Sequence, residues 1–323
     1  MKKALLHTSV LACVLMLAAC GSQAEETEGT EQEGPASESE SSGEQVVTYL
    51  GEDYTIPEKV ERIVVTGAME AMEDSLVLDV EPIGVMTVGG SVPEMFAPIT
   101  SNAEPIGEKT EPDVEKILSL DPDVILASTK FPPEVVEELE KVAPTIKISH
   151  IASDWEESLE FLGQLTGKED LATESIASYY SELDEAKESI GDQLDDKTVL
   201  AVRVRNNDLY IYPSSIFVNS ILYDDLDIAA PVVTEAAQAQ ELISIEQLAE
   251  INPDYLFIQD AAAENSGAET EIIDQLKQDP ILDNVPALTE DQTYVNIIDP
   301  LSEGGPSWSR MAFLNEVTSL FEN

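Results

Sequence analysis

A helix–proline–strand unit occurs twice in this chain, and it constrains the fold more than any other feature. The copies span residues 113–126 and 244–257, and they align without a gap: 246 − 115 = 131 and 253 − 122 = 131. In each, a short amphipathic segment with glutamate at the same position (Glu115, Glu246) ends at a proline, which cannot extend a helix. A continuous apolar run follows, as in a strand buried on both faces of a parallel sheet. The duplication predicts two lobes of one design.

The first twenty residues have the pattern of an export signal. Lys2 and Lys3 form a basic start, a mostly apolar stretch follows, and Leu-Ala-Ala-Cys ends it at Cys20. The apolar stretch is too short for a membrane-spanning helix of the mature protein. We therefore expect a signal peptide over residues 1–19 and a lipid anchor on Cys20, which would hold the chain on the extracytoplasmic face of the cell membrane. The alternative is a plain secreted protein with an incidental cysteine.

The chain has only two cysteines, both near its start, and the segment after them has a biased composition. Cys13 would leave with the signal and Cys20 would be acylated, so no disulfide, thiolate metal site or cysteine nucleophile is expected in the mature chain. Residues 20–48 are mainly Glu, Ser and Gly. Such a sequence buries too little apolar surface to offset chain entropy, and we expect an acidic, disordered tether.

The charge of the chain is strongly negative. The formal net charge is −49, and removing the signal takes two lysines, which leaves 14 basic and 65 acidic residues, or 14 − 65 = −51. This balance argues against nucleic acid and anionic lipid as partners. A solvated exterior suited to a saline or alkaline environment explains the acidity without a specific role. Each Lys or Arg is therefore conspicuous.

Residues 49–167 predict a first α/β lobe, because apolar runs alternate with helical segments. Residues 87–107 are rich in Gly, Pro, Ser and Asn and are expected to be loop. Ligands of such parallel sheets bind at the carboxyl ends of strands, and Lys130 follows one of these ends. The expected strands are 62–66, 82–86, 124–127 and 145–149, and the expected helices include 70–79 and 133–142.

Residues 168–194 predict a long helix between the lobes, and residues 195–323 predict a second α/β lobe. Roughly two dozen residues in one helix span about 30 Å or more, enough to bridge two lobes. In the second lobe, Arg203 and Arg205 lie two apart on a strand and so point to one face. A turn at 206–208 and a hairpin partner at 209–212 follow, with further strands at 255–258 and 293–296 and a closing helix at 307–321.

Two classes of chemistry find little support in the residues. After signal removal His150 is the sole histidine, so a multi-histidine zinc or manganese site is not expected. No serine–histidine arrangement or glycine-rich phosphate loop is recognisable either. We expect no enzyme and no protein-bound metal, although a chelate hydrolase, or a surface adhesin or sensor, stays open as an alternative.

The layout resembles the substrate-binding lipoproteins of bacterial ABC importers for iron–siderophore and related chelates. The resemblance implies two three-layer α/β lobes joined by one rigid helix, with a ligand cleft between them. It also implies a monomer that takes a ferric siderophore and delivers it to an ABC permease dimer with a cytoplasmic ATPase. The features that carry it are Cys20, the pairs Glu115/Pro122 and Glu246/Pro253, the long helix, and Gly305–Arg310.

The same resemblance implies the roles of individual residues. In this family one glutamate on each lobe docks into arginine pockets of the permease, and the matching positions are Glu115 and Glu246. Oxygens of a ferric chelate suit charge-assisted hydrogen bonds from Arg and Lys, and its flat groups suit aromatic rings. The expected ligand-binding residues are Lys130, Arg203, Arg205, Tyr212, Trp308 and Arg310.

The class of chelate is ranked from these side chains. Arg203 and Arg205 favour a catecholate or citrate group, but Lys130 is the only cation that the sequence indicates in the first lobe. Hydroxamate or citrate-hydroxamate siderophores are therefore ranked first and catecholates next. Ferric citrate, cobalamin and haem are the alternatives.

Overall fold

The computed structural model describes residues 43–205, 208–260 and 272–321. The expected signal peptide, Cys20 and nearly all of the expected tether lie outside the described residues, as do the turn residues 206–207. Within the described ranges, no helix combines the length and the apolar character needed to cross a membrane.

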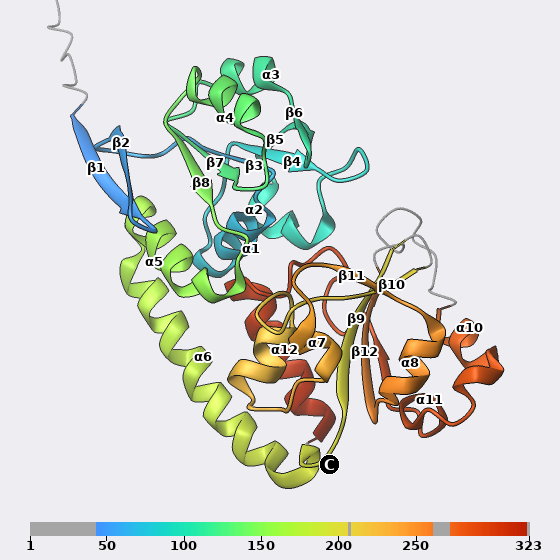
Figure 1. The fold of residues 1–323 in the computed structure, drawn as a ribbon. Helices are drawn as coiled ribbons and strands as arrows, with labels where there is room; N and C mark the ends of the chain where they lie inside the picture. Colours follow the sequence, from blue (N-terminus) through green and yellow to red (C-terminus); the bar gives the residue numbers. More distant parts are fainter. Residues whose placement is uncertain (1–42, 206–207, 261–271, 322–323) are drawn as a thin grey trace, which may run out of the picture. The chain divides into compact units, whose positions relative to one another are not determined.

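The first sheet has six strands in the order β6-β5-β4-β3-β7-β8 (Figure 1). All neighbours pair in parallel except β5 and β6, which pair antiparallel at one edge. Its central strands are fully buried, as their continuous apolar runs predict. The strands are β3 Ile63–Thr66, β4 Gly84–Thr87, β5 Glu104–Glu108, β6 Glu111–Pro112, β7 Val124–Ser128 and β8 Thr145–Ile148.

The second sheet has five strands in the order β11-β10-β9-β12-β13. Strands β9, β12 and β13 are parallel, whereas β10 and β11 add an antiparallel edge. The expected hairpin is present as β9 and β10, with Arg203 opposite Tyr210. The strands are β9 Val199–Arg205, β10 Asp208–Ile211, β11 Glu241–Ile243, β12 Tyr255–Asp260 and β13 Thr293–Val295.

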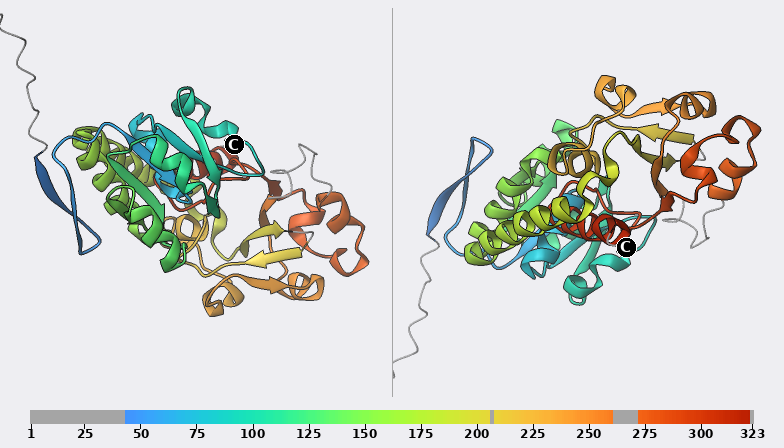
Figure 2. Two further views of the ribbon diagram at one scale, coloured as in Figure 1. Left: turned by 90° about the horizontal axis from the view of Figure 1, so that it is seen from above. Right: turned by 90° about the horizontal axis from the view of Figure 1, so that it is seen from below.

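Helix α6, of 22 residues, joins the two sheets and packs against α5 and α12. Seen from below in Figure 2, α12 lies beside α6. The helices are α1 Met69–Leu78, α2 Ala97–Thr100, α3 Val114–Ser119, α4 Pro133–Glu140, α5 Trp155–Thr166, α6 Glu169–Ile190, α7 Val232–Ala236, α8 Ile245–Ile251, α10 Ile272–Gln278, α11 Pro286–Thr289 and α12 Ser307–Phe321. Shorter turns are the 3₁₀ segments η1 Glu94–Phe96, η2 Ala152–Asp154, η3 Gly191–Leu194 and η5 Pro280–Leu282, and the π-helical segment η4 Ser220–Asp225.

One hydrophobic core runs through both lobes. Side chains alternate along a strand, and one face of each sheet enters this shared core: Val65 from β3 and Ala201 from β9 join Tyr179 of α6 and Phe313 of α12. The opposite faces form separate clusters under each lobe's own helices. The α/β fold with two sheets and a long connecting helix is confirmed, while the predicted domain boundaries stay predictions.

The two copies of the repeat fold alike. Asp113 caps the N-terminus of helix α3, and its side chain accepts the Lys116 N–H at 2.9 Å. Ser244 caps α8 in the same way and forms a capping box with Gln247. Both helices are followed by the Pro-containing turn and then by a central strand, β7 or β12. The duplicated pattern therefore corresponds to a duplicated structural unit.

Two segments differ from the prediction. The expected tether reached residue 48, but Glu44–Tyr49 forms strand β1, which pairs with β2 (Glu52–Pro57). The cause is burial of Val47 and Tyr49, whose hydroxyl lies 2.8 Å from Ser158 Oγ. The expected loop at 87–107 contains η1, α2 and the start of β5.

Candidate functional site

A cavity of about 630 Å³ lies between the two lobes, at the carboxyl ends of the parallel strands. Its walls come from residues that are far apart in the sequence, and both cations and aromatic rings are among them. The first lobe contributes Glu70, Asp74, Lys109, Lys130, Ser149, His150, Ile151, Ala152, Trp155 and Ser158. The second contributes Arg203, Arg205, Tyr212, Ile216, Phe217, Gln238, Ala239, Gln240, Glu303, Gly305 and Pro306.

Two lysines form the cationic part of the first wall. Lys109 directly follows β5 and Lys130 follows β7, so the ends of two parallel strands bring them together. Lys109 forms an ion pair with Glu303 of the other lobe. The Lys130 ammonium lies 2.9 Å from Glu70 and 3.6 Å from Glu303. Both lysines thus interact with the same carboxylate of the second lobe, that of Glu303.

Two arginines form the cationic part of the second wall. Arg203 and Arg205 follow Val199 and Ala201 on the face of β9 that looks into the shared core, and the end of the strand carries them to the cavity. Arg203 is only 6 % exposed, and its guanidinium lies 5.0 Å from the Phe217 ring centre and 5.9 Å from that of Tyr212. Among the described atoms its Nε–H has no acceptor. A buried, unsatisfied donor is costly and indicates a missing partner.

The cations change the proton affinity of their neighbours. Burial acts to raise the pKa of Glu303, but Lys109, Lys130 and Arg203 together hold it well below the usual range. Burial acts to lower the pKa of Lys130, but Glu303 and Glu70 raise it above its usual value. Glu303 and Lys130 therefore stay charged at neutral pH. Burial and the nearby Glu303 raise the pKa of Glu70, which favours its neutral form.

Two buried carboxyls of helix α1, Glu73 and Asp74, bind the loop that leads into α12 of the second lobe. Glu73 accepts the backbone N–H of Glu303 at 2.7 Å and that of Ser309 at 3.2 Å. Asp74 accepts the Ser307 hydroxyl at 2.6 Å. The two backbones approach so closely at Gly305 that a Cβ there would lie 2.6 Å from the Ala152 Cβ. These contacts fix the distance across the cavity.

These carboxyls make stability depend on pH. Burial raises the pKa of Glu73 to about 8 and that of Asp74 to about 7, although their hydrogen bonds act to lower both values. A raised folded-state pKa stabilises the native state fully below the unfolded-state value, and this stabilisation is lost as pH rises through the folded-state pKa. We expect the free energy of unfolding to fall by a few kcal/mol between about pH 5 and about pH 9.

Urea unfolding at a series of pH values measures this dependence. Glu73→Gln should flatten the curve between about pH 7 and about pH 9, where Asp74 has largely titrated, and lessen its slope below about pH 7. The exposed Glu104→Gln is the control and should leave the slope unchanged. A wild-type curve that is level across this range would contradict the prediction.

The structure brings together four of the six expected ligand-binding residues: Lys130, Arg203, Arg205 and Tyr212 all line the cavity. Tyr212 donates its hydroxyl to Gln240 at 2.8 Å, and Arg205 donates to the same oxygen at 3.3 Å. Trp308 is half-buried and lies outside the cavity lining.

The expectation for Arg310 needs correction. Its side chain is buried and forms an ion pair with Asp225, and it donates to Ser220 Oγ at 3.0 Å and to Ala152 O at 3.2 Å. Its guanidinium is thus engaged inside the protein rather than at the cavity. Arg310 supports the cavity from behind, because Ala152 is part of the lining.

Sequence reasoning missed several residues of the cavity. Lys109 lies just past the expected loop, between residue 107 and the first copy of the repeat, and Glu303 is one of 65 acidic residues. Trp155 and His150, at the end of the first lobe, also line the cavity. The Thr129 hydroxyl lies 2.8 Å from His150 Nδ1. Lys109 and His150 come just after strands of the first sheet, Trp155 begins α5, and Glu303 lies in the loop before α12. These positions converge only once the strand order is known.

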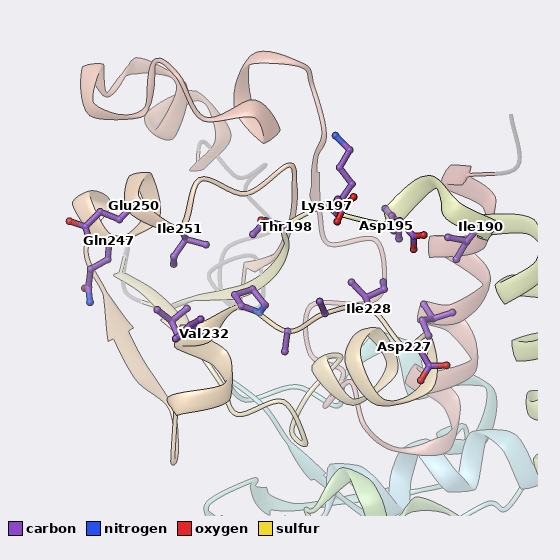
Figure 3. Close-up of a pocket in the computed structure, with 18 residues that line it drawn as sticks. Ile190, Asp195, Lys197, Thr198, Asp227, Ile228, Val232, Gln247, Glu250 and Ile251 are labelled. Carbon is purple, nitrogen blue, oxygen red and sulfur yellow. The ribbon is translucent and has the colours of Figure 1, made fainter.

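A larger cavity of about 740 Å³ lies at the opposite end of the second lobe's strands (Figure 3). Apolar residues such as Ile228, Val232 and Ile251 surround it. Its lining has four carboxylates and one cation, Lys197, which pairs with Asp254 at 3.1 Å. Such a lining offers little to an anionic ligand, so the cavity between the lobes is the candidate site.

The two glutamates of the repeat lie outside the cavity. Glu115 and Glu246 are each the second residue of their helix, α3 and α8, and both are exposed. They occupy matching positions because each helix is capped two residues earlier, by Asp113 in α3 and by Ser244 in α8. Both side chains are accessible to another protein.

Two α/β lobes around a central cavity define a class of solute-binding proteins, and comparison with known families agrees. The family model described as periplasmic binding protein matches residues 64–296. The chain therefore belongs to the periplasmic binding protein family, whose members bind solutes and are not enzymes.

Individual relatives extend this result. The chain is 43 % identical over 314 residues to the iron-uptake system-binding protein of Bacillus subtilis, covering 97 % of both chains. It is 29 % identical to the iron(3+)-hydroxamate-binding protein FhuD of the same organism, covering 76 % of this chain and 77 % of the relative. The crystal structure of the triscatecholate siderophore-binding protein FeuA of B. subtilis, complexed with ferri-bacillibactin, matches with a TM-score of 0.80 at 43 % identity, covering 85 % and 97 %.

Proposed function

We propose that this protein is the extracytoplasmic receptor of an ABC importer and that it captures a ferric tris-catecholate siderophore. The observation that carries the proposal is the convergence of Lys109, Lys130, Arg203 and Arg205 on one cavity. These are four of the 14 basic residues beyond the signal segment, in a chain with 65 acidic residues. A triply anionic chelate would neutralise this group, and charge-assisted hydrogen bonds are the strong ones.

The ranking of chelates made from the sequence is thereby reversed. Hydroxamate and citrate-hydroxamate siderophores were ranked first because Lys130 was the only cation indicated in the first lobe. Lys109 provides the second. The 43 % identity to a protein whose structure holds ferri-bacillibactin, a tris-catecholate complex, supports the same order. The lower identity to a hydroxamate-binding relative supports the alternative less.

Aromatic rings complete the proposed site. Trp155, Tyr212 and Phe217 line the cavity, and flat catecholate rings suit contact with such side chains. The iron would be enclosed by the siderophore, so the protein would contact the chelate rather than the metal. No group of three or more His, Cys, Asp or Glu residues suited to a metal is found in the part of the chain that the structure describes.

Titration with a panel of ferric chelates tests the proposal. Quenching of tryptophan fluorescence should report binding, because Trp155 lines the cavity and Trp308→Phe leaves it as the single tryptophan of the chain. We expect a triply anionic tris-catecholate to bind more tightly than ferric hydroxamates or ferric citrate. Tighter binding of a neutral hydroxamate would overturn the proposed ligand class, and no binding of any chelate would overturn the function.

Delivery to the permease would use the two glutamates of the repeat. We expect the double variant Glu115→Ala, Glu246→Ala to bind the chelate like the wild type and to lose uptake, because both side chains are exposed and outside the cavity. Uptake of radioactive iron by cells that lack the wild-type protein measures this. The exposed pair Glu137→Ala, Glu188→Ala is the control. Wild-type uptake by the double variant would remove the docking role.

Anchoring through Cys20 is part of the proposal. The residues around Cys20 have the pattern of a lipid-attachment site. The receptor would act as a monomer, tethered to the outer face of the cytoplasmic membrane beside its permease. Cys20→Ala should release the protein into the medium, whereas cell-bound Cys20→Ala would argue against the anchor.

A further inference from the structure

Among the cavity carboxylates that the structure describes, Glu303 alone is surrounded by several cations. It forms an ion pair with Lys109, lies 3.6 Å from Lys130, and faces Arg203. It is therefore bound to the groups that an anionic chelate would also seek. The other cavity carboxyls, Glu70 and Asp74, lie on α1, and burial raises the pKa of each.

The position of Glu303 is fixed by the backbone. Its N–H is held by Glu73 at 2.7 Å, and the neighbouring Gly305 packs directly on Ala152. The carboxylate side chain is 14 % exposed, at the side of the cavity. A fixed backbone with a terminal carboxylate in the cavity means that the side chain can change partner without movement of the lobes.

We propose that Glu303 is an internal counter-ion, which competes with the anionic chelate for Lys109 and Lys130 and so sets both the charge preference and the release rate of the site. In the empty protein the carboxylate neutralises part of the cationic group and keeps both ammonium groups at the cavity. A chelate that binds takes over these ammonium groups, and Glu303 takes them back as the chelate leaves. The inference rests on the proposed function and adds to it a residue that limits affinity.

The formal charges agree with this role. With Glu70 and Asp74 counted in the protonated form that their raised pKa values favour, four cations and one charged carboxylate give 4 − 1 = 3 positive charges, the number that a triply anionic chelate balances. A receptor must release its ligand to the permease, and a site with a charge excess would hold a trianion longer. Charged groups at a buried site act on dissociation more than on association. Glu303 would thus shorten the time for which the ligand stays bound.

Glu303→Gln removes the charge and keeps the shape, and it is the direct test. The probes are a synthetic tripodal ferric tris-catecholate, which is triply anionic, and its neutral tris-hydroxamate counterpart. Affinity and dissociation rate are followed on the full mature chain by tryptophan fluorescence. We expect affinity for the trianion to rise about tenfold, mainly through slower dissociation, and affinity for the neutral chelate to change less than about threefold.

Further variants keep the test decisive. Glu104→Gln, which removes the partner of Lys116 away from the cavity, should change neither affinity. In a Lys109→Met background the gain from Glu303→Gln should shrink, because one contested cation is missing. If Glu303→Gln does not fold, Glu303→Asp withdraws the carboxylate by one methylene and should give a smaller gain in the same direction.

The outcomes separate this inference from the proposed function. Equal or weaker binding of the trianion by folded Glu303→Gln, while the wild type binds it tightly, would overturn the counter-ion role and leave the function intact. An equal gain for the neutral chelate would also overturn it, because a charge effect must favour the anion. Wild-type protein that binds neither probe would overturn the function and this inference together.

Discussion

Replacing Arg203 by methionine should weaken binding of a triply anionic ferric chelate by roughly 30- to 1000-fold, or about 2 to 4 kcal/mol. Arg203 is 6 % exposed, stacks on Phe217 and Tyr212, and has an Nε–H without an acceptor among the described atoms. Its charge is therefore poorly solvated in the empty protein, and the chelate would supply the missing oxygen. Methionine keeps most of the apolar stem and removes every donor.

The titration by tryptophan fluorescence that tests the function also measures this loss. Lys141→Met is the control, since Lys141 pairs with exposed Glu138 on the surface. Arg203→Lys should restore only part of the affinity, because an ammonium group lacks the planar fork that binds two oxygens at once. Folded Arg203→Met that binds the trianion as tightly as the wild type would remove Arg203 from the site.

The placement of Arg203 could be predicted because strand geometry is simple. The period of two along β9 puts Arg203 and Arg205 on one face, and the end of the strand puts them near the ligand edge of the sheet. The repeat was equally informative, since its two prolines set where α3 and α8 end. The sequence pattern was sufficient for prediction wherever the position of a side chain depended on one helix or one strand alone.

Lys109 could not be predicted, because the strand before it has little local signal. The sequence of β5, Glu104–Glu108, contains one strongly apolar residue, Ile106, beside a proline and a glycine. It becomes a strand by pairing with β4, an interaction between segments some twenty residues apart. Tertiary context overrode local propensity here, as is common for short strands.

Burial of charged side chains was the other feature that could not be predicted from the sequence. Arg203 and Arg310 are both arginines near apolar residues, and their sequence neighbourhoods do not say which one reaches the cavity. The partner of Arg310 is Asp225, 310 − 225 = 85 residues away, in the π-helical segment η4. Only the packing of α12 against α6 and η4 brings these two together.

Replacing Arg310 by methionine is accordingly expected to lower the free energy of unfolding by about 3 to 5 kcal/mol, the usual effect of removing one partner of a buried ion pair. Asp225 would lose its cation, although Tyr179 also donates its hydroxyl to that carboxylate. The carbonyl of Ala152 would lose a donor, and the cation–π contact with Trp155, at 5.1 Å, would vanish. Urea unfolding at neutral pH measures the loss.

Ligand affinity distinguishes this structural role from a ligand-binding one. Below its unfolding range, Arg310→Met should bind the chelate within about threefold of the wild type, because the guanidinium points at Asp225 and Ser220 rather than into the cavity. The double variant Arg310→Met, Asp225→Asn should be more stable than Arg310→Met alone, since no unpaired charge is left buried. A stable Arg310→Met with affinity as poor as that of Arg203→Met would return Arg310 to the ligand site and refute the structural assignment.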